Sequence, residues 1–521
     1  MDDEFAKLIR RINPPRVIVD NGACGHATFI QVDSVNKHEI LLEIVQVLSD
    51  LNLNVTKAYI SSDAGWFMDG CLCLVLSSDF IFQLYKNLLR GSLSENASTN
   101  QGNALPFREP FKALFESKPD LPHNTAVIIS NSFVFSVFYV TDNQGKKITD
   151  EETLGYIQKT LETKIYILNS MKSSASLIPS KDHISTTIEL TGNDRPGLLS
   201  ELSAVLADMG CNVINAEIWT HNARAATVIH ITDRSTGHAI EDPDRLSTIK
   251  ELLFNVMKGD SDFKTPSARM FVSTSRETHT GRRLHQMLLA DRDFERHNDK
   301  CSMEPHVTVL DCSDRDYTVV TIRCLDRPKL LFDTVCCLTD MEYVVFHGTV
   351  IIGRLEAYQE YYIRHVDGFP ISSEAEQQRV MECLEAAIER RTAQGVELEV
   401  ITEDRFGVLS EITRIIRENG LSIKRAEIRR NGGKANDRFI VSDVMGNGVV
   451  DPKTMEMVQK EIGGLGEEGG CGVKVEGNNS SLLLSTKLPK EKHETRTSFS
   501  FGNLFKGRSF HNFNKLIKSC S

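Results

Sequence analysis

TTIELTGNDRPGLLSELSAVLADMGCNVINAEI, residues 186–218, is the stretch of the chain that decides its fold. Ile188 and Leu190 alternate with polar neighbours, as in a strand with one buried face. Five apolar residues then recur at the spacing of one helical face: Leu198, Leu199, Leu202, Val205 and Leu206. The stretch therefore predicts a strand, a sharp turn, an amphipathic helix and a second strand.

The turn at 194–197 is suited to present the start of the helix to a ligand. Asp194 can cap the helix, and Pro196 suits its first turn because no amide hydrogen bond is lost there. Gly197 lets another group approach the backbone closely. Since the first amides of a helix have no partner within it, they can bind an anion such as a carboxylate.

Three further stretches repeat this pattern, at 28–60, 317–350 and 396–428, and we name the four units repeats 1 to 4 in chain order. Repeat 4 keeps the aspartate, arginine and glycine of the turn in Asp404, Arg405 and Gly407. Lys329 in repeat 3 and Glu39 in repeat 1 stand where the glycine is expected. A carboxylate at a helix N-terminus would repel an incoming carboxylate. The sequence thus favours ligand sites at the turns of repeats 2 and 4.

Four copies of a strand, an Asp-Arg-Pro-Gly-like turn, a helix and a strand resemble the ACT domain, a small-molecule-sensing module of amino-acid metabolism. The whole chain resembles the plant ACT-domain-repeat (ACR) proteins, and the stretches at 278–295 and 499–519 share in this resemblance. The resemblance implies an α+β fold of four ferredoxin-like βαββαβ repeats with antiparallel sheets. It also implies that ACT units pair, and that ligands lie where the turn of one unit meets its neighbour.

The expected domain boundaries follow from the period of the repeats. ACT domains 1 to 4 are expected at 27–163, 185–259, 316–391 and 395–476, with a charged connector at 260–315 and a basic aromatic tail at 477–521. Only residues 392–394 separate repeats 3 and 4, so these two are expected to be neighbours in space.

The first repeat is interrupted by residues 70–136, which match neither the other repeats nor the family. Deleting them joins Trp66–Asp69 to Val137–Asp142 and restores the period of the other repeats. A long structureless insertion in a compact domain is uncommon, which favours a retained intron or a gene-model artefact. A genuine variable loop is the alternative.

The connector contains an apolar helical face formed by Leu284, Met287, Leu288 and Phe294 among charged residues. Three histidines in this region, His279, His285 and His297, have no metal-ligand spacing. We therefore expect a solvated helix that docks between repeats, rather than a metal or acid/base site.

Composition bounds the function further. A net charge of −11 argues against direct nucleic-acid binding. The acidic N-terminus lacks an apolar core, and the 12 cysteines show no C-x-x-C pair, so a cytoplasmic or nuclear location is expected. The basic and aromatic segment 499–518 suggests a peripheral membrane or protein contact, with a disordered tail as the alternative. Pairing of ACT units also allows a homo-oligomer.

No catalytic constellation, phosphate-binding loop or metal cluster occurs in the sequence, and no cofactor is predicted. The first hypothesis is therefore a non-catalytic regulatory protein that binds a free amino acid and senses amino-acid or nitrogen status. The alternative is an ACT-based interaction scaffold without a small-molecule ligand.

We expect repeat 2 to carry the best-formed site. The candidate ligand-binding residues lie in the two turns and at the entry to the second strand of repeat 2, where two asparagines are expected to face a neighbouring turn. They are Asp194, Arg195, Pro196, Gly197, Leu198, Leu199, Asn212, Asn215, Asp404, Arg405, Gly407, Val408 and Leu409.

Overall fold

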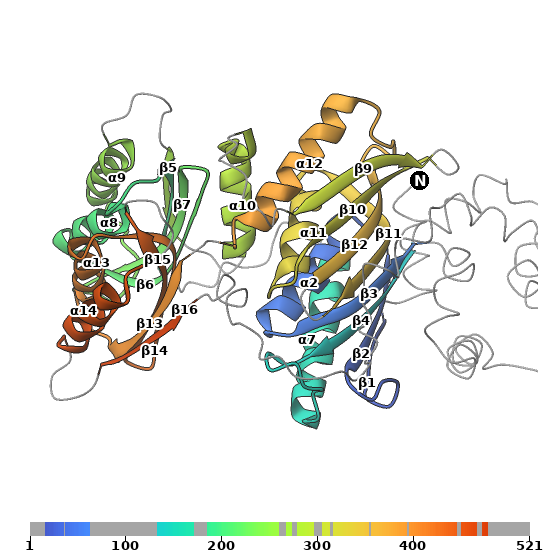
Figure 1. The fold of residues 1–521 in the computed structure, drawn as a ribbon, viewed down its shortest axis with the longest axis horizontal. Helices are drawn as coiled ribbons and strands as arrows, with labels where there is room; N and C mark the ends of the chain where they lie inside the picture. The colour runs from blue at the N-terminus through green and yellow to red at the C-terminus, as the bar shows by residue number, and fades with distance from the viewer. Residues whose placement is uncertain are drawn as a thin grey trace, which may run out of the picture. The chain divides into compact units, whose positions relative to one another are not determined.

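The fold was analysed in a computed structural model (Figure 1). The structure describes residues 16–35, 37–62, 133–170, 185–259, 267–272, 279–295, 305–312, 316–353, 356–392, 395–444, 450–465 and 471–477. The tail segment 499–518 and His297 lie outside the described residues. Among the described residues, no helix combines the length and the apolar character needed to span a bilayer.

Repeats 2 and 4 have the expected order of strand, helix, strand, strand, helix, strand. Repeat 2 consists of β5 (Thr186–Asn193), α8 (Leu198–Asp208), β6 (Cys211–His221), β7 (Arg224–Asp233), α9 (Pro243–Lys258) and β8 (Ser267–Val272). Repeat 4 consists of β13 (Val396–Glu403), α13 (Val408–Glu418), β14 (Leu421–Asn431), β15 (Lys434–Asp443), α14 (Pro452–Gly463) and β16 (Gly472–Gly477).

Repeats 1 and 3 differ from that order, because their fourth strand precedes the first. Repeat 1 consists of β1 (Arg16–Asp20), β2 (Thr28–Val35), α2 (Ile40–Asp50), β3 (Asn54–Ser61), β4 (Phe133–Thr141) and α7 (Glu151–Ser170). Repeat 3 consists of β9 (His306–Cys312), β10 (Tyr317–Leu325), α11 (Leu330–Asp340), β11 (Tyr343–Ile352), β12 (Glu356–His365) and α12 (Glu374–Glu389). In all four repeats the fourth strand pairs antiparallel with the first strand, whether it comes before it (β1, β9) or after the second helix (β8, β16).

Three of the expected ranges therefore omit a strand. Strand β1 precedes the range 27–163, and both β8 and β9 fall inside the range 260–315 that was expected to be a connector. What remains of the connector in the described residues is α10 (Thr280–Ala290) and a 3₁₀ turn, η1 (Asp293–Glu295). The α+β class and the antiparallel sheets of ACT-type repeats are confirmed.

The repeats pair across the chain, and each pair forms one eight-stranded sheet (Figure 1). In repeats 1 and 3, β3 pairs with β11. In repeats 2 and 4, β6 pairs with β14. Repeats 3 and 4, which the short link led us to expect as neighbours in space, thus lie in different sheets. A three-residue link limits the distance between two chain ends but not which edges pair. Each unit has its second and fourth strands at its edges, and the second strands form the pairing between repeats.

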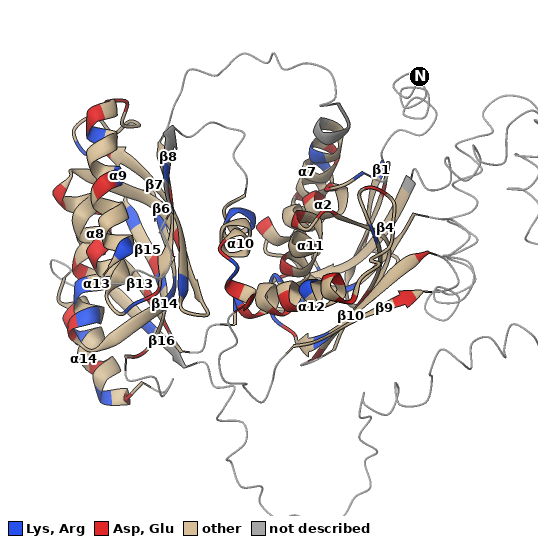
Figure 2. Ribbon diagram, turned by 90° about the horizontal axis from the view of Figure 1, so that it is seen from above, with Lys and Arg blue, Asp and Glu red and all other residues tan. Residues whose placement is uncertain are grey.

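The helices of each pair cover one face of its sheet. Apolar residues of α8, α9, α13 and α14 form one core with Ile188, Leu190, Ala216 and Ile218, and charged residues lie on these helices as well (Figure 2). Leu198, Leu199, Leu202 and Leu206 are buried as predicted.

Helix α10 covers the opposite face of the sheet of repeats 2 and 4. Leu284, Met287 and Leu288 of the predicted face pack with Trp219 and Val228, whereas Phe294 lies in η1 and packs in the core of repeats 1 and 3. Because α10 covers this face, strand β5 is buried on both faces, not on one as expected. The helix is also less solvated than expected, since His285 is only 2% exposed.

Each first helix of a repeat begins after a residue with a positive φ. The four residues are Glu39 (78°), Gly197 (81°), Lys329 (65°) and Gly407 (81°). Contrary to the expectation for repeat 2, Asp194 does not cap the helix and Pro196 lies before it. The turn is closed instead by the backbone, because the amide of Leu198 donates to the carbonyl oxygen of Arg195 at 3.2 Å.

The end of the proposed insertion belongs to the sheet. Residues 133–136, which fall inside the expected insertion at 70–136, form the start of β4 and pair with β2, and Phe135 and Ser136 also pair with β3. Residues 70–132 lie outside the described residues.

Candidate functional site

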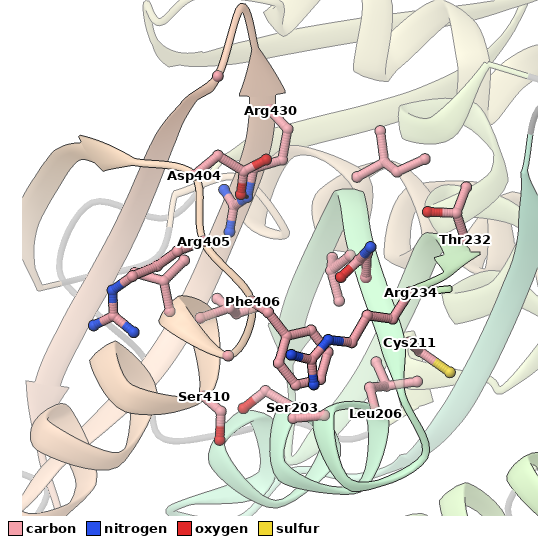
Figure 3. Close-up of a pocket in the computed structure, with 18 of the residues that line it drawn as sticks. Ser203, Leu206, Cys211, Thr232, Arg234, Asp404, Arg405, Phe406, Ser410 and Arg430 are labelled. Carbon is pink, nitrogen blue, oxygen red and sulfur yellow. Dashed lines mark ion pairs between the residues drawn. The ribbon is translucent and has the colours of Figure 1, made fainter. Parts of the chain in front are cut away.

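The candidate site is a cavity of about 510 Å³ between the turn of repeat 4 and the sheet of repeat 2 (Figure 3). Repeat 4 supplies the turn from Asp404 to Ser410 and the β14–β15 hairpin loop. Repeat 2 supplies the start of β6, residues from α8, and the end of β7. The pairing of β6 with β14 brings these segments together, although about 170 residues separate them along the chain.

The helix start of repeat 4 opens into this cavity. Gly407 is the N-cap of α13, and no side chain caps the helix. The amide of Val408 donates to Arg405 at 3.2 Å, whereas the amides of Leu409 and Ser410 have no acceptor within the helix. A Cβ placed on Gly407 would meet no atom within 4 Å. The turn therefore offers backbone donors to an anion.

Two of the three arginines that line the cavity are neutralised by acids. Arg430 forms an ion pair with Asp404 at 3.0 Å and a second, shorter one with the buried Asp437. Burial raises the pKa of Asp437, while Arg430 opposes that shift. Arg405, in the turn before α13, donates to Glu411 of that helix at 2.8 Å, which lowers the pKa of the glutamate. Both arginines thus hold the turn and hairpin in place.

The third arginine has a different partner. The guanidinium carbon of Arg234, at the end of β7, lies 3.9 Å from the ring centroid of Phe406. A guanidinium over an aromatic ring at this distance is attracted by the electrons of the ring face. In Figure 3 this pair stands between the α13 turn and the β7 side of the cavity.

Polar groups of repeat 2 complete the lining. Asn212 and Thr232 are paired across β6 and β7, and both line the cavity. A bulge follows between Val213 and Asn215, which changes the register of β6. Asn215 is exposed, shares the α10 face of the sheet with Trp219, and does not line the cavity. Only one of the two expected asparagines therefore meets the turn of repeat 4.

The turn of repeat 2, expected to be the best-formed site, is filled. Gly197, Leu198 and Leu199 line a space of only about 10 Å³. A Cβ on Gly197 would lie 2.7 Å from Cδ of Arg417. The equivalent of Arg417 in the first helix of repeat 2 is Ala207, which lines the open cavity instead. Arg417 therefore fills the space beside the turn of repeat 2, whereas the smaller Ala207 leaves the space beside the turn of repeat 4 open.

The remaining residues predicted for repeat 2 bind neighbouring elements. Lys424 donates to Asp194 at 3.2 Å, and burial raises the pKa of this aspartate against the effect of Lys424. Arg195 donates to Glu201 at 2.7 Å and to the carbonyl oxygen of Val256 at 3.1 Å. These contacts give the Asp194–Gly197 turn a positioning role in repeat 2.

The turns of repeats 1 and 3 carry side chains in place of glycine. Glu39 binds Arg282 of α10 at 2.6 Å, and Arg282 also reaches Asp340 at 3.0 Å. Burial and the nearby Arg391 lower the pKa of Lys329. In repeat 1, therefore, the turn serves as a contact for the connector helix.

Sequence reasoning missed Arg234, Phe406 and Arg417 as determinants of the site. A signal for Arg417 was present, because aligning the first helices of repeats 2 and 4 sets it opposite Ala207. Arg234 lay beyond the motif, and only the pairing of the sheets brings it to Phe406.

Comparison with known proteins places the repeats in a family. The model for the ACR family N-terminal ACT domain matches residues 23–73, and the ACT domain model matches residues 186–243 and 396–461. The ACT domain-containing protein ACR4 of Arabidopsis thaliana is 48% identical over 528 residues, covering 100% of this chain and 99% of that protein. ACR6 of the same plant is 48% identical over 509 residues, covering 97% and 99%.

Proposed function

The chain belongs to the ACT domain-containing ACR family, and on that premise we propose that it is a non-catalytic regulatory protein that binds a free amino acid in the cavity beside Gly407. The observation that carries this proposal is the open turn of repeat 4. The cavity beside this turn has a volume of about 510 Å³, which lies in the range of small-molecule sites. A role as a sensor of amino-acid or nitrogen status follows from such binding.

The lining groups suit both ends of an amino acid. The ligand carboxylate would accept from the amides of Leu409 and Ser410, at the positive end of the α13 dipole. The ligand ammonium would donate to the side-chain oxygens of Asn212 and Thr232. Asp404, Arg405 and Val408 would hold the turn in position for these contacts. The site would then need both repeats, which links ligand binding to the pairing of β6 with β14.

The alternative function, an interaction scaffold without a ligand, is supported by the other pair of repeats. The turn of repeat 1 is engaged by Arg282, so this pair holds α10 through the place where a ligand would otherwise lie. The two functions can coexist in one chain, with repeats 1 and 3 holding the connector and repeats 2 and 4 binding the ligand.

The substitution Gly407→Glu tests the proposal. It copies Glu39 of repeat 1, which adopts the same positive φ, and it places a carboxylate where the ligand carboxylate would bind. Loss of two charge-assisted hydrogen bonds of at least about 1.5 kcal/mol each should weaken binding roughly 100-fold. Isothermal titration calorimetry across the twenty amino acids measures this change.

Gly420→Glu is the matched control. Gly420 follows α13, has a φ of 72° and open space around its Cβ position, and does not line the cavity. The control should bind the ligand as the parent chain does. Equal affinity in Gly407→Glu and in the parent would overturn the proposed site, and binding of no amino acid by the parent would favour the scaffold.

Three further proposals concern the setting of the protein. We propose a cytoplasmic or nuclear location, which a fluorescent fusion in plant cells would test. A homo-oligomer formed by ACT pairing is testable by sedimentation, although two such pairings already occur within the chain. Contact of the segment 499–518 with a membrane or a protein is testable by vesicle co-sedimentation of the full chain and of a chain ending at residue 498.

A further inference from the structure

We propose that the cavity selects amino acids with an acidic side chain, and that Arg234 binds the side-chain carboxylate. This inference rests on the proposed function and names the class of ligand for the same site. It starts from the charges that line the cavity. Three arginines face a single aspartate there, and that aspartate is already paired with Arg430.

Arg234 is the arginine of this lining whose charge is not matched by an acid. Arg405 has Glu411, and Arg430 has Asp404 and Asp437. Within the described part of the chain, the Arg234 side chain has no ion pair or hydrogen bond, and its contact is the ring of Phe406. A cationic group in this position makes an anion the favoured occupant of the adjoining space.

The contact with Phe406 leaves the hydrogen-bonding capacity of Arg234 unused. Stacking engages the flat face of a guanidinium, whereas its five N–H donors point outward in the plane. The backbone is also fixed, because the Arg234 amide donates to the carbonyl oxygen of Gly210 at 3.0 Å. Arg234 is exposed at the cavity, and its fork of donors fits a carboxylate in a bidentate manner.

The cavity accordingly has two separate positions for negative charge. The helix start of repeat 4 provides one, and Arg234 of repeat 2 provides the other. An amino acid with an acidic side chain has two carboxylates and would occupy both positions. A neutral amino acid would fill only the helix start and would leave Arg234 without an anion.

The pair of Arg234 and Phe406 is specific to this cavity. The register of the strands places Val444 at the position equivalent to Arg234 in repeat 4, and the Val444 amide donates to Gly420 as the Arg234 amide donates to Gly210. The residue equivalent to Phe406 in repeat 2 is Pro196. The filled turn of repeat 2 therefore lacks an equivalent of Arg234 and an equivalent of Phe406.

The test compares acidic ligands with their neutral isosteres by calorimetry on the full chain. Glutamate should bind more tightly than glutamine, and aspartate more tightly than asparagine, by roughly 10-fold to 100-fold, the effect of a hydrogen-bonded charge. In Arg234→Gln, the affinity for the acidic ligand should fall by that factor while the affinity for the neutral isostere changes by less than about 3-fold.

Two control variants sharpen the comparison. Arg234→Lys keeps the charge without the flat fork and should retain part of the preference. Arg414→Gln removes an exposed arginine of α13 that pairs with Glu418 outside the cavity, and it should leave all affinities unchanged. Equal binding of acidic and neutral ligands by the parent chain would overturn the inference but keep the proposed function. An equal loss of affinity for the acidic and the neutral ligand in Arg234→Gln would likewise overturn the inference and keep the proposed function. If the parent binds no amino acid, both proposals fail.

Discussion

Arg417 of repeat 4 lies across Gly197 of repeat 2, with its Cδ 2.7 Å from the point that a Cβ on that glycine would occupy. At the equivalent point beside Gly407 there is open space, because Ala207 replaces the arginine. The two paired repeats are alike in fold but differ in the volume available at their turns. This difference leads to a prediction about the number of ligands that one chain binds.

The parent chain should bind one amino acid, and Arg417→Ala should bind two. Truncation to alanine removes the side chain that fills the repeat 2 turn and leaves the amides of Leu199 and Ser200 accessible. Stoichiometry from calorimetry or native mass spectrometry measures the change. The second ligand should bind more weakly, since Pro196 and Val444 stand where the open site has Phe406 and Arg234.

The reverse change, Ala207→Arg, should close the open cavity. An arginine at this position would lie across Gly407 as Arg417 lies across Gly197, and affinity should fall by at least roughly 10-fold, the effect of losing one charge-assisted hydrogen bond. Ala207→Ser is a control of nearly unchanged volume. Full binding by the arginine variant, with a melting temperature like that of the parent, would count against the equivalence of the two sites.

Arg391→Met should destabilise the protein strongly. Arg391 Nε lies 2.7 Å from Asp333 Oδ1, and its guanidinium carbon lies 4.2 Å from the Trp219 ring centroid. Because Asp333 is fully buried, removing one cation should lower the free energy of unfolding by about 3–5 kcal/mol. Urea denaturation measures this loss. The exposed Arg414→Met should cost less than about 1 kcal/mol.

Acid should weaken the structure around His285. Burial is the main cause that lowers the pKa of His285 to about 4, with Asp333 opposing. Its Nδ1 must accept the hydrogen bond, because Arg390 Nη1 at 3.0 Å can only donate. Nε2–H then donates to Asp333 Oδ1 at 2.8 Å, so the ring is neutral.

The unfolded chain takes up this proton near its usual pKa of about 6.5, so the free energy of unfolding should fall as pH decreases from about 6.5 towards 4. His285→Gln should flatten that slope in denaturation experiments at several pH values. The hydrogen bonds to Asp293 and Glu389 raise the pKa of His221 against the effect of its burial, so that residue contributes stability below pH 6.5. His221→Gln should therefore lower the free energy of unfolding by a similar amount across this acidic range, and it should remove a loss of stability that the parent shows as pH rises above about 6.5. An unchanged acidic slope in His285→Gln would contradict the neutral state assigned to His285.

Removing residues 70–136 should keep strand β4 intact. Ser136 pairs with Ile60, and its equivalents Thr227, Gln359 and Asp437 each follow their partners, Ile218, Val350 and Ile428, by nine residues. The deletion sets Asp69 nine residues after Ile60 and gives Trp66–Asp69 the place of 133–136. Thermal unfolding should occur at the same temperature as in the parent, or higher.

A deletion one residue longer, 69–136, provides the control for register. It shortens the hairpin by one residue and moves Trp66 to the place of the buried Val134, so it should unfold at a lower temperature. Sequencing of the spliced transcript addresses the origin of the segment. A major transcript that encodes residues 70–136 would rule out the intron hypothesis.

The sequence by itself determined the units of this fold. Apolar spacing located the first helix of repeat 2, and the same spacing in the connector identified Leu284, Met287 and Leu288 as a docking face. It also identified the turn of repeat 4 that borders the cavity. These features are local, because alternation, helical periodicity and turn chemistry act over a few residues.

The tertiary structure alone decided how the units combine. Repeats 1 and 3 pair, as do repeats 2 and 4, through second strands that all four units expose alike, so no pattern within a single repeat encodes which units pair. The same pairing sets Arg417 against Gly197 and Arg234 against Phe406. Which turn is open therefore depends on side chains far away in sequence, because two packed units share one space and a single arginine is large enough to fill it.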